Sequence, residues 1–298
     1  MTPPSLHRFS HQAMGTFFEV TIAGEDAAYA GQAAQAAFNE IDRLERLFSR
    51  FDPTSEIRRI GRLRPGESLM IGHETYECLT AAEKVRVETD GAFDINVRRA
   101  AKYGPAAGTG AGDGPAQGPG RILTLARTDR GFEVQRAEQA DAPWQPLDLD
   151  LGAIGKGDAL DKALAILADW SIENALVHSG TSTAAAVGNA PETKGWPVGV
   201  GGGWPSDGPR EIALSGRALS GSGTEVKGPH VIDPRTGEPA KGHLAAWAMH
   251  RSACVADALS TAFMVMDTAE VEAYCGRHPD VWALVVKNYG DCRAFGEQ

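Results

Sequence analysis

The stretch DLDLGAIGKGDALDKALAIL (Asp148–Leu167) constrains the fold more than any other part of the chain. It places three glycines between an alternating apolar run and the pattern of an amphipathic helix: Gly152, Gly155 and Gly157. Such glycines indicate either a turn that only glycine adopts or a close approach of another group to the backbone. The order GxxxxGK[ST] of a P-loop is missing. A helix N-terminus after glycines still favours anions, and Asp150 and Lys156 add charges of both signs. A tight turn with a solvated Lys156 is the alternative.

The composition indicates a soluble globular protein. The chain has 298 residues, of which 42% are hydrophobic and 23% charged, and its net charge is −10 without any run of Lys or Arg. This balance argues against nucleic acid or an anionic membrane as the main partner. We expect no secretory or lipoprotein signal and no membrane span. The expected location is therefore the cytoplasm, or the periplasm if a targeting segment has been removed. The four cysteines form no CxxC pair, which predicts reduced core thiols and leaves one disulfide open.

The order of helical and strand patterns predicts an α+β fold with mixed or antiparallel sheets, packed helices and one domain over residues 1–298. A strand is expected at 16–24, a long helix at 26–48, a short helix after Ser55 and a helix at 74–89. Later segments predict a hairpin within 121–137, an apolar strand broken at Gly180, a buried helix from Ala253 and a closing hairpin. Residues 103–120 are so rich in Gly, Pro and Ala that we expect a flexible loop.

A carboxylate and a hydroxyl stand one helical turn apart in DALST, at Asp257 and Thr261. Both are hard oxygen ligands of the kind that Mg²⁺ or Ca²⁺ prefers. Alternatively, Asp257 caps the helix and Thr261 bonds back to a carbonyl. A carboxylate in so apolar a helix needs a partner, because a lone buried charge is costly.

Three further motifs leave their roles open. His230 in HVIDPRTG is a general base, a phosphate contact or a histidine that holds a turn. GTST (Gly180–Thr183) and SGSG (Ser220–Gly223) could donate to a phosphate or form ordinary turns. GxSxG occurs only in truncated form, which excludes a serine hydrolase of that type.

Read in order, these motifs resemble the FAD:protein FMN transferases, the ApbE-like flavin transferase family. The most specific parts are DLGAIGKGDALD, HVIDPRTGEPA and ADALSTAFMVM, and MGTFFEVTI, FSRFDPTSEI and GAFD support them. The resemblance covers nearly the whole chain. It implies an enzyme with an FAD site in a central cleft, which uses Mg²⁺ to transfer FMN from FAD to a Thr or Ser hydroxyl of a partner protein, with AMP as the leaving group. The alternatives are an FAD pyrophosphatase that releases FMN and AMP, and a non-catalytic FAD-binding protein.

The resemblance also implies roles for individual residues. The metal ligands would be the carbonyl of Ala153 with Asp257 and Thr261, and His230 or Asp257 would activate the hydroxyl. The residues that match FAD contacts are Met14, Phe51, Ala92, Phe93, Asp94, Asp150, Lys156, Ser182 and Ile232.

The chain departs from the family pattern in two places within this set. Gly180-Thr181-Ser182 stands where the family commonly has Gly-Gly-Asp or Gly-Gly-Asn, so Ser182 keeps hydrogen bonding without the carboxylate or amide. Phe51 stands where a Tyr often stacks on the flavin; it keeps the aromatic face and loses the hydroxyl.

Overall fold

The computed structural model describes residues 5–98, 122–138, 145–201, 211–224, 231–288 and 290–297. His230 and the loop expected at 103–120 lie outside these residues. Helices and antiparallel sheets are mixed, which confirms the predicted α+β class. The strands are β1 (Leu6–Ala13), β2 (Thr16–Ala23), β3 (Ser68–Ile71), β4 (Leu123–Thr128), β5 (Gly131–Arg136), β6 (Ala175–Ser179), β7 (Thr183–Val187), β8 (Trp196–Gly199), β9 (Glu211–Leu214), β10 (Arg217–Gly223), β11 (Ala245–His250), β12 (Trp282–Asn288) and β13 (Asp291–Phe295). The helices are α1 (Ala27–Phe48), α2 (Glu56–Gly61), α3 (His73–Glu88), α5 (Gly155–Asp169), α6 (Ala253–Val265) and α7 (Thr268–Arg277).

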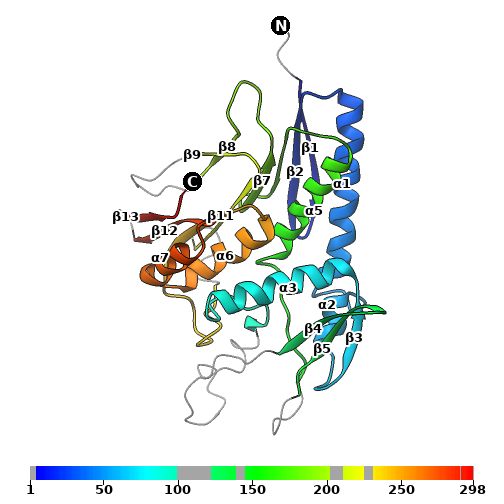
Figure 1. Ribbon diagram of the computed structural model, residues 1–298, viewed down its shortest axis with the longest axis vertical. Coiled ribbons are helices and arrows are strands. Elements are labelled where there is room, and N and C mark those ends of the chain that lie inside the picture. The colour runs from blue at the N-terminus through cyan, green and yellow to red at the C-terminus, as the bar shows by residue number, and fades with distance from the viewer. Residues whose placement is uncertain are drawn as a thin grey trace.

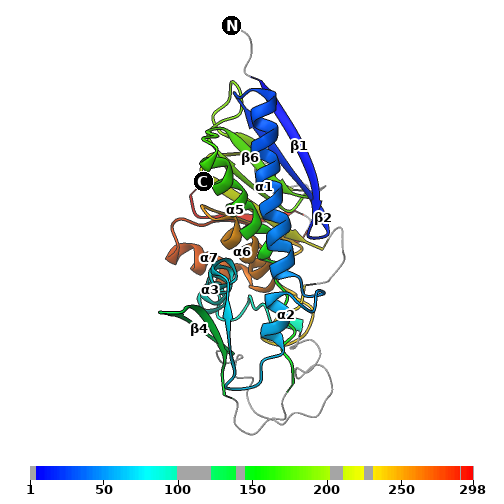
Figure 2. The same cartoon turned by 90° about the vertical axis from the view of Figure 1, so that its right-hand side faces the viewer.

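One eight-stranded sheet organises the molecule. Its order is β1-β2-β6-β7-β10-β11-β12-β13, and every neighbouring pair is antiparallel. Helices α1, α5 and α6 pack against it, with α1 and α5 running side by side (Figures 1 and 2). A smaller sheet, β3-β5-β4, lies with α2 and α3 at the end of the molecule away from the N-terminus (Figure 1). Because α5 and α6 pack on the large sheet, they contact strands and each other although they are distant in the sequence.

Alternation along the strands gives the sheet two apolar faces. On β7 and β10, Ala185 and Ala218 belong to the main core with the helices. Their neighbours Ala184 and Leu219 belong to a second core. In the second core they pack with Trp196, Ile212 and Leu214 of the β8–β9 hairpin. Because side chains alternate along a strand, one run of small apolar residues serves both cores.

Local sequence explains the helices that matter for the site. Asp26 caps the N-terminus of α1. The apolar residues of α1 recur at helical spacing on its buried side. Ser252 caps α6 by accepting a hydrogen bond from Val255 N. Asp161 of α5 accepts three more, from Ser252 Oγ (2.6 Å), Ala253 N (2.7 Å) and Cys254 N (3.0 Å). The N-terminus of α6 is therefore fixed by a carboxylate of α5.

Most predicted elements are present, one expectation was wrong, and β1, β3, β11 and α7 were not predicted. The single strand broken at Gly180 is in fact two strands, β6 and β7, that pair across a turn where Gly180 has φ +54°. The strand β1 was not predicted, because it is an edge strand whose side chains are mostly exposed or half-buried. The helix α7 was also missed, although Asp267 and Glu270 form a capping box at its start.

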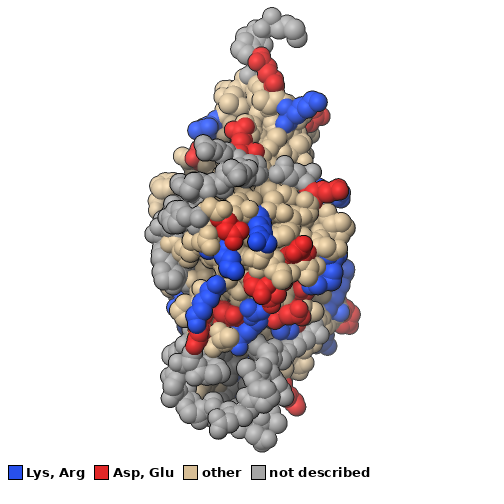
Figure 3. Space-filling view, turned by 90° about the vertical axis from the view of Figure 1, so that its left-hand side faces the viewer, with Lys and Arg blue, Asp and Glu red and all other residues tan. Residues whose placement is uncertain are grey.

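The surface and the helices add two general observations. Lys, Arg, Asp and Glu intermingle on the face shown in Figure 3, so the described part of that face carries no broad field of one sign. Among the described residues, every helix is too short or too polar to cross a lipid bilayer.

Candidate functional site

Asp257 is the centre of a buried polar cluster. It lies in the middle of α6 and is 4% exposed. Its Oδ2 is 3.5 Å from Lys156 Nζ and accepts a hydrogen bond from Gly157 N at 3.2 Å. Its Oδ1 accepts hydrogen bonds from Thr183 Oγ1 and Ser220 Oγ, each at 3.3 Å. Three segments thus meet at one carboxylate, and the capping role is excluded because Ser252 caps the helix.

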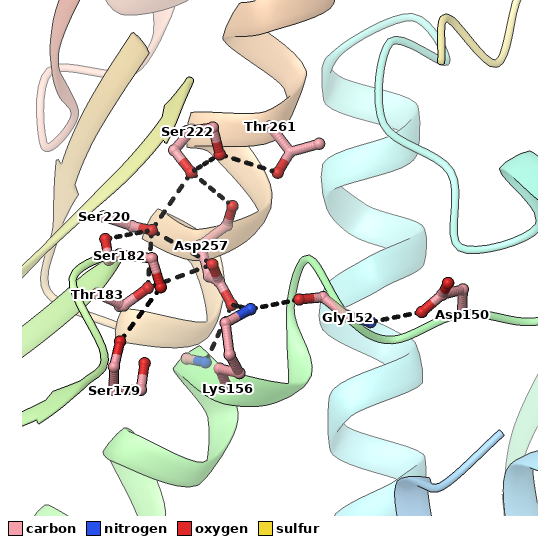
Figure 4. Close-up of polar contacts among 12 residues, drawn as sticks. Asp150, Gly152, Lys156, Ser179, Ser182, Thr183, Ser220, Ser222, Asp257 and Thr261 are labelled. Carbon is pink, nitrogen blue, oxygen red and sulfur yellow. Dashed lines mark hydrogen bonds and ion pairs between the residues drawn. The ribbon is translucent and has the colours of Figure 1, made fainter. Parts of the chain in front are cut away.

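Hydroxyl groups extend the cluster toward Thr261, as Figure 4 shows. Ser222 Oγ lies 3.3 Å from Thr261 Oγ1 and 2.9 Å from Ser260 Oγ. Ser220 Oγ lies 3.3 Å from Ser260 Oγ and 2.9 Å from Thr183 Oγ1. Ser220 and Ser222 are two residues apart on β10, so their side chains lie on the same face of the strand, toward α6. The predicted pair Asp257 and Thr261 is therefore joined by strand hydroxyls whose role the sequence left open.

Ser182 joins the cluster through its backbone. Its carbonyl accepts hydrogen bonds from Ser220 Oγ at 3.3 Å and Gly221 N at 2.7 Å. Its own hydroxyl donates to the Ser179 carbonyl at 3.2 Å. In this arrangement the side chain of Ser182 stabilises the β6–β7 turn.

Gly157, in the first turn of α5, allows a close approach between two helices. None of Gly152, Gly155 and Gly157 has a positive φ. A Cβ on Gly157 would lie 2.1 Å from the carbonyl oxygen of Ala253, so α5 and α6 touch through their backbones. The same turn directs Lys156 Nζ to the Gly152 carbonyl and toward Asp257. Lys156 is thus held beside the carboxylate, and the solvated alternative is excluded.

Asp150 connects the turn to two arginines that sequence reasoning missed. Its Oδ1 accepts a hydrogen bond from Gly152 N at 2.9 Å. Its Oδ2 lies 3.5 Å from Arg50 Nε and 3.6 Å from Arg98 Nη1. The Arg50 guanidinium in turn lies 4.3 Å from the ring centre of Phe51, whose side chain is highly exposed. A chain of contacts therefore links Phe51 to the glycine turn.

Ala92, Phe93 and Asp94 are buried beside this turn. Asp150 N donates to the Ile95 carbonyl at 2.7 Å, which fixes the two segments side by side. Asp94 accepts a hydrogen bond from Asn96 N at 2.8 Å. Burial raises the pKa of Asp94 above its ordinary value, against the opposing effects of that hydrogen bond and of Arg86.

The two remaining predicted contacts lie further from Asp257. Met14 has φ +50° in the β1–β2 turn, and its N donates to Glu45 Oε1 at 2.7 Å. Strand β2, which follows that turn, contacts the β6–β7 turn through the hydrogen bond from Gly180 N to the Phe17 carbonyl, 2.7 Å long. Ile232 pairs with Pro239 in an isolated bridge. Within the described residues, no hydrogen bond joins Met14 or Ile232 to Asp257 directly.

The chemical character of the cluster limits what it can bind. Apart from Lys156, its side chains offer only carboxylate and hydroxyl oxygens, which suit a hard cation. The N-terminus of α5 adds the positive end of a helix dipole. Its N-cap residue is Ile154, and no side chain caps this end. Such a site can hold a hard cation together with an anionic group.

Comparisons with known proteins agree with one another. The family model described as the ApbE family matches residues 14–285. The chain is 27% identical to the FAD:protein FMN transferase of Salmonella typhimurium (strain LT2), with 95% of this chain and 85% of the relative covered. It is 26% identical to the FAD:protein FMN transferase of Escherichia coli (strain K12), with 86% and 77% covered.

Solved structures show the same fold. The crystal structure of the ApbE protein from Thermotoga maritima has a TM-score of 0.78 at 25% identity and covers 98% of this chain and 97% of its own. The flavin transferase ApbE from Vibrio cholerae has a TM-score of 0.78 at 21% identity, with 99% and 98% covered.

Proposed function

Because the chain belongs to the ApbE family, we propose that it is an FAD:protein FMN transferase that depends on Mg²⁺. In the proposed reaction, a Thr or Ser hydroxyl oxygen of a partner protein bonds to the phosphorus of the FMN half of FAD. The bond from that phosphorus to the bridging oxygen breaks, and AMP leaves with the bridging oxygen. The hydroxyl proton passes to a base on the enzyme. The name of the two bacterial relatives supports the transfer.

The observation that carries this proposal is the buried carboxylate of Asp257 inside an oxygen-lined cluster beside Lys156. Asp257 and Thr261 supply the hard donors for Mg²⁺, and the resemblance adds the Ala153 carbonyl from the turn before α5. The oxygen chemistry of the cluster fits this ion. When bound, Mg²⁺ would neutralise charge on the pyrophosphate and orient it.

The chain's own residues would bind and orient the rest of FAD. Lys156 brings an ammonium to the N-terminus of α5, where an anionic phosphate is favoured. The exposed ring of Phe51 offers a face for the isoalloxazine. Arg50 and Arg98 surround Asp150 and hold it beside the turn. Asp94, Ala92, Phe93, Ser182, Met14 and Ile232 complete the proposed FAD contacts.

The base remains a choice between His230 and Asp257. Asp257 already accepts hydrogen bonds on both oxygens and is the proposed cation ligand. A neutral imidazole near pH 7 is suited to take a proton from an incoming hydroxyl. We therefore assign the role of general base to His230, which lies outside the described residues.

A hydrolase that acts on FAD is the second candidate, since the same cluster could act on FAD with water as the nucleophile in place of a protein hydroxyl. The transferase and the hydrolase reactions differ only in the group that receives FMN, a protein hydroxyl or water. Incubation with FAD and Mg²⁺ separates them: AMP and free FMN without an acceptor indicate hydrolysis. An FMN mass added to Thr- or Ser-containing test peptides indicates transfer. A non-catalytic binding protein would give neither product.

Replacing Asp257 tests the site itself. We expect Asp257→Asn to lower AMP release from FAD at least about 10²-fold, since even outer-shell partners of a metal are worth about 10–100-fold. Asp129→Asn is the control, because Asp129 is exposed in the β4–β5 turn. Chelation of the divalent cation should abolish the activity of the unmodified protein. Equal AMP release by Asp257→Asn and the unmodified protein would exclude Asp257 from the site.

A further inference from the structure

A second polar cluster lies in the core between three helices. Cys78 of α3, Asp158 of α5 and Cys254 of α6 each direct one potential ligand atom to the same place, and these atoms lie within 4.8 Å of one another. The residues are 0%, 5% and 4% exposed, respectively. The cluster is distinct from the oxygen-lined one, since no residue is shared.

One oxygen of the Asp158 carboxyl group in this cluster has no partner. Asp158 Oδ2 is buried and makes no hydrogen bond within the described structure. An unpaired buried polar atom is costly, so its presence calls for an explanation. The two thiols share a hydrogen bond and form no disulfide. Cys254 also hydrogen-bonds the Asp158 carboxyl, so the site contains two protonated sulfurs and a carboxyl group of which one oxygen, Oδ2, lacks a partner.

The donor set selects a class of cation. Two sulfurs and one carboxylate oxygen suit Zn²⁺ or its larger analogue Cd²⁺, whereas Mg²⁺ avoids thiolates. A tetrahedral ion with bonds of about 2.3 Å to sulfur separates two sulfurs by about 3.8 Å. The three ligand atoms lie within 4.8 Å of one another, so they need to move little to reach that separation. Small side-chain adjustments would therefore bring all three ligands onto one ion.

We propose that Cys78, Asp158 and Cys254 form a binding site for a thiophilic divalent cation of the zinc class, which ties α3, α5 and α6 together. Above the Asp158 pKa of about 7, binding would break two S–H bonds, form two metal–sulfur bonds and one metal–oxygen bond, and release both thiol protons to solvent. Below that pH the proton of the Asp158 carboxyl would leave as well. Two thiolates and one carboxylate would leave the site with one net negative charge. Lys162, one turn after Asp158, lies near enough to attract that charge, while its ion-pair partner Glu77 and Asp161 oppose it.

The site would act on the same helix as the proposed reaction. Cys254 precedes Asp257 by three residues on α6, and Asp158 follows Gly157, which contacts the Asp257 carboxylate. A cation here would therefore hold in place the two helices that build the oxygen-lined cluster. The proposal does not depend on the flavin chemistry.

Cadmium titration provides the test. Reduced, metal-free protein carrying Cys292→Ser, which removes the half-buried thiol, is titrated with Cd²⁺ in excess Mg²⁺. At pH ~8, where Asp158 is already ionised, we expect a thiolate-to-cadmium charge-transfer band in the ultraviolet that saturates at one equivalent, with about two protons released per ion. The thermal unfolding midpoint should rise. Absence of the band would overturn the proposal.

Variants assign the ligands. Cys78→Ser and Cys254→Ser should each remove the band, and Asp158→Asn should weaken Cd²⁺ binding about 10-fold or more. Cys275→Ser is the matched control, because Cys275 is buried in α7 outside the cluster and should leave the band unchanged. If a serine variant fails to fold, the Cd²⁺ affinity of Asp158→Asn tests the site instead. Unchanged Cd²⁺ affinity in Asp158→Asn, or a band that survives Cys78→Ser, would refute the site.

Discussion

At the scale of single residues, Phe51 combines an exposed aromatic ring with a fixed position. It is 79% exposed, and the guanidinium of Arg50 lies over its ring while also reaching Asp150. Stacking of a base on an aromatic side chain is worth about 1–3 kcal/mol. If Phe51 stacks on the flavin, Phe51→Ala should weaken FAD binding by that amount, as measured by flavin fluorescence titration.

The matched control for this residue is Phe17→Ala. Phe17 is also an exposed phenylalanine, at 60%, but it lies on β2, where it pairs with Gln12 of β1. FAD affinity should not change in Phe17→Ala. Equal affinity of Phe51→Ala and the unmodified protein would remove Phe51 from the flavin site.

At the scale of elements, the contact between α5 and α6 is set by Gly157. Its Cβ would meet the backbone of Ala253 at 2.1 Å, whereas a Cβ on Gly155 would make ordinary contacts at 3.5 Å and beyond. Gly157→Ala should lower the free energy of unfolding by about 1–3 kcal/mol through overpacking. Gly155→Ala, in the same helix, should be neutral or stabilising by up to about 1 kcal/mol, because alanine favours helices.

Urea unfolding of both variants measures this difference, and FAD affinity reports its effect on the site. Because Gly157 N also donates to Asp257, displacement of α6 in Gly157→Ala should weaken FAD binding as well. A Gly157→Ala protein as stable as Gly155→Ala would show that the two helices do not depend on this contact.

At the scale of the whole molecule, Asp158 makes stability depend on pH. Burial raises its pKa to about 7, and the opposing effect of Lys162 is too small to prevent this, while Asp161 and Glu77 add to it. Between pH ~4 and ~7 the folded protein holds a proton that the unfolded chain releases. The free energy of unfolding should therefore fall as pH rises through this range and level off above it.

Asp158→Asn removes this titration. Measured with a chelator present, its stability relative to the unmodified protein should rise between pH ~4 and ~7, by an amount on the order of 2–4 kcal/mol. Asp169→Asn, an exposed change on the same helix, should follow the unmodified protein at every pH. Parallel curves for Asp158→Asn and the unmodified protein would contradict the buried-carboxyl explanation.

Local patterns predicted the elements that depend on local forces. The apolar residues of α1 recur at helical spacing, and Asp257 and Thr261 stand one helical turn apart on α6, so the sequence shows both directly. The half-exposed edge strand β1 has no such clear pattern. Gly180 indicated a break in the strand but not the reversal of direction that forms the β6–β7 hairpin.

Contacts between distant segments could not be read in the same way. Ser220 and Ser222 reach Asp257 and Thr261 only because β10 lies under α6. Arg50 and Arg98 reach Asp150 from separate parts of the chain. The pairing of Cys78 with Cys254 likewise results from the packing of α3 on α6. Such contacts are properties of the tertiary fold, which spacing along the chain does not record.

The strand order of the large sheet has a consequence for how the protein is made. Each strand lies beside the strand of that sheet that precedes it in the chain. During synthesis, at about 5–20 residues per second, every new strand can pair with one that has already left the ribosome. The turn with Lys156 therefore leaves the ribosome seconds before Asp257 does. The oxygen-lined cluster is completed late in translation, when α6 arrives on a sheet that is already largely built.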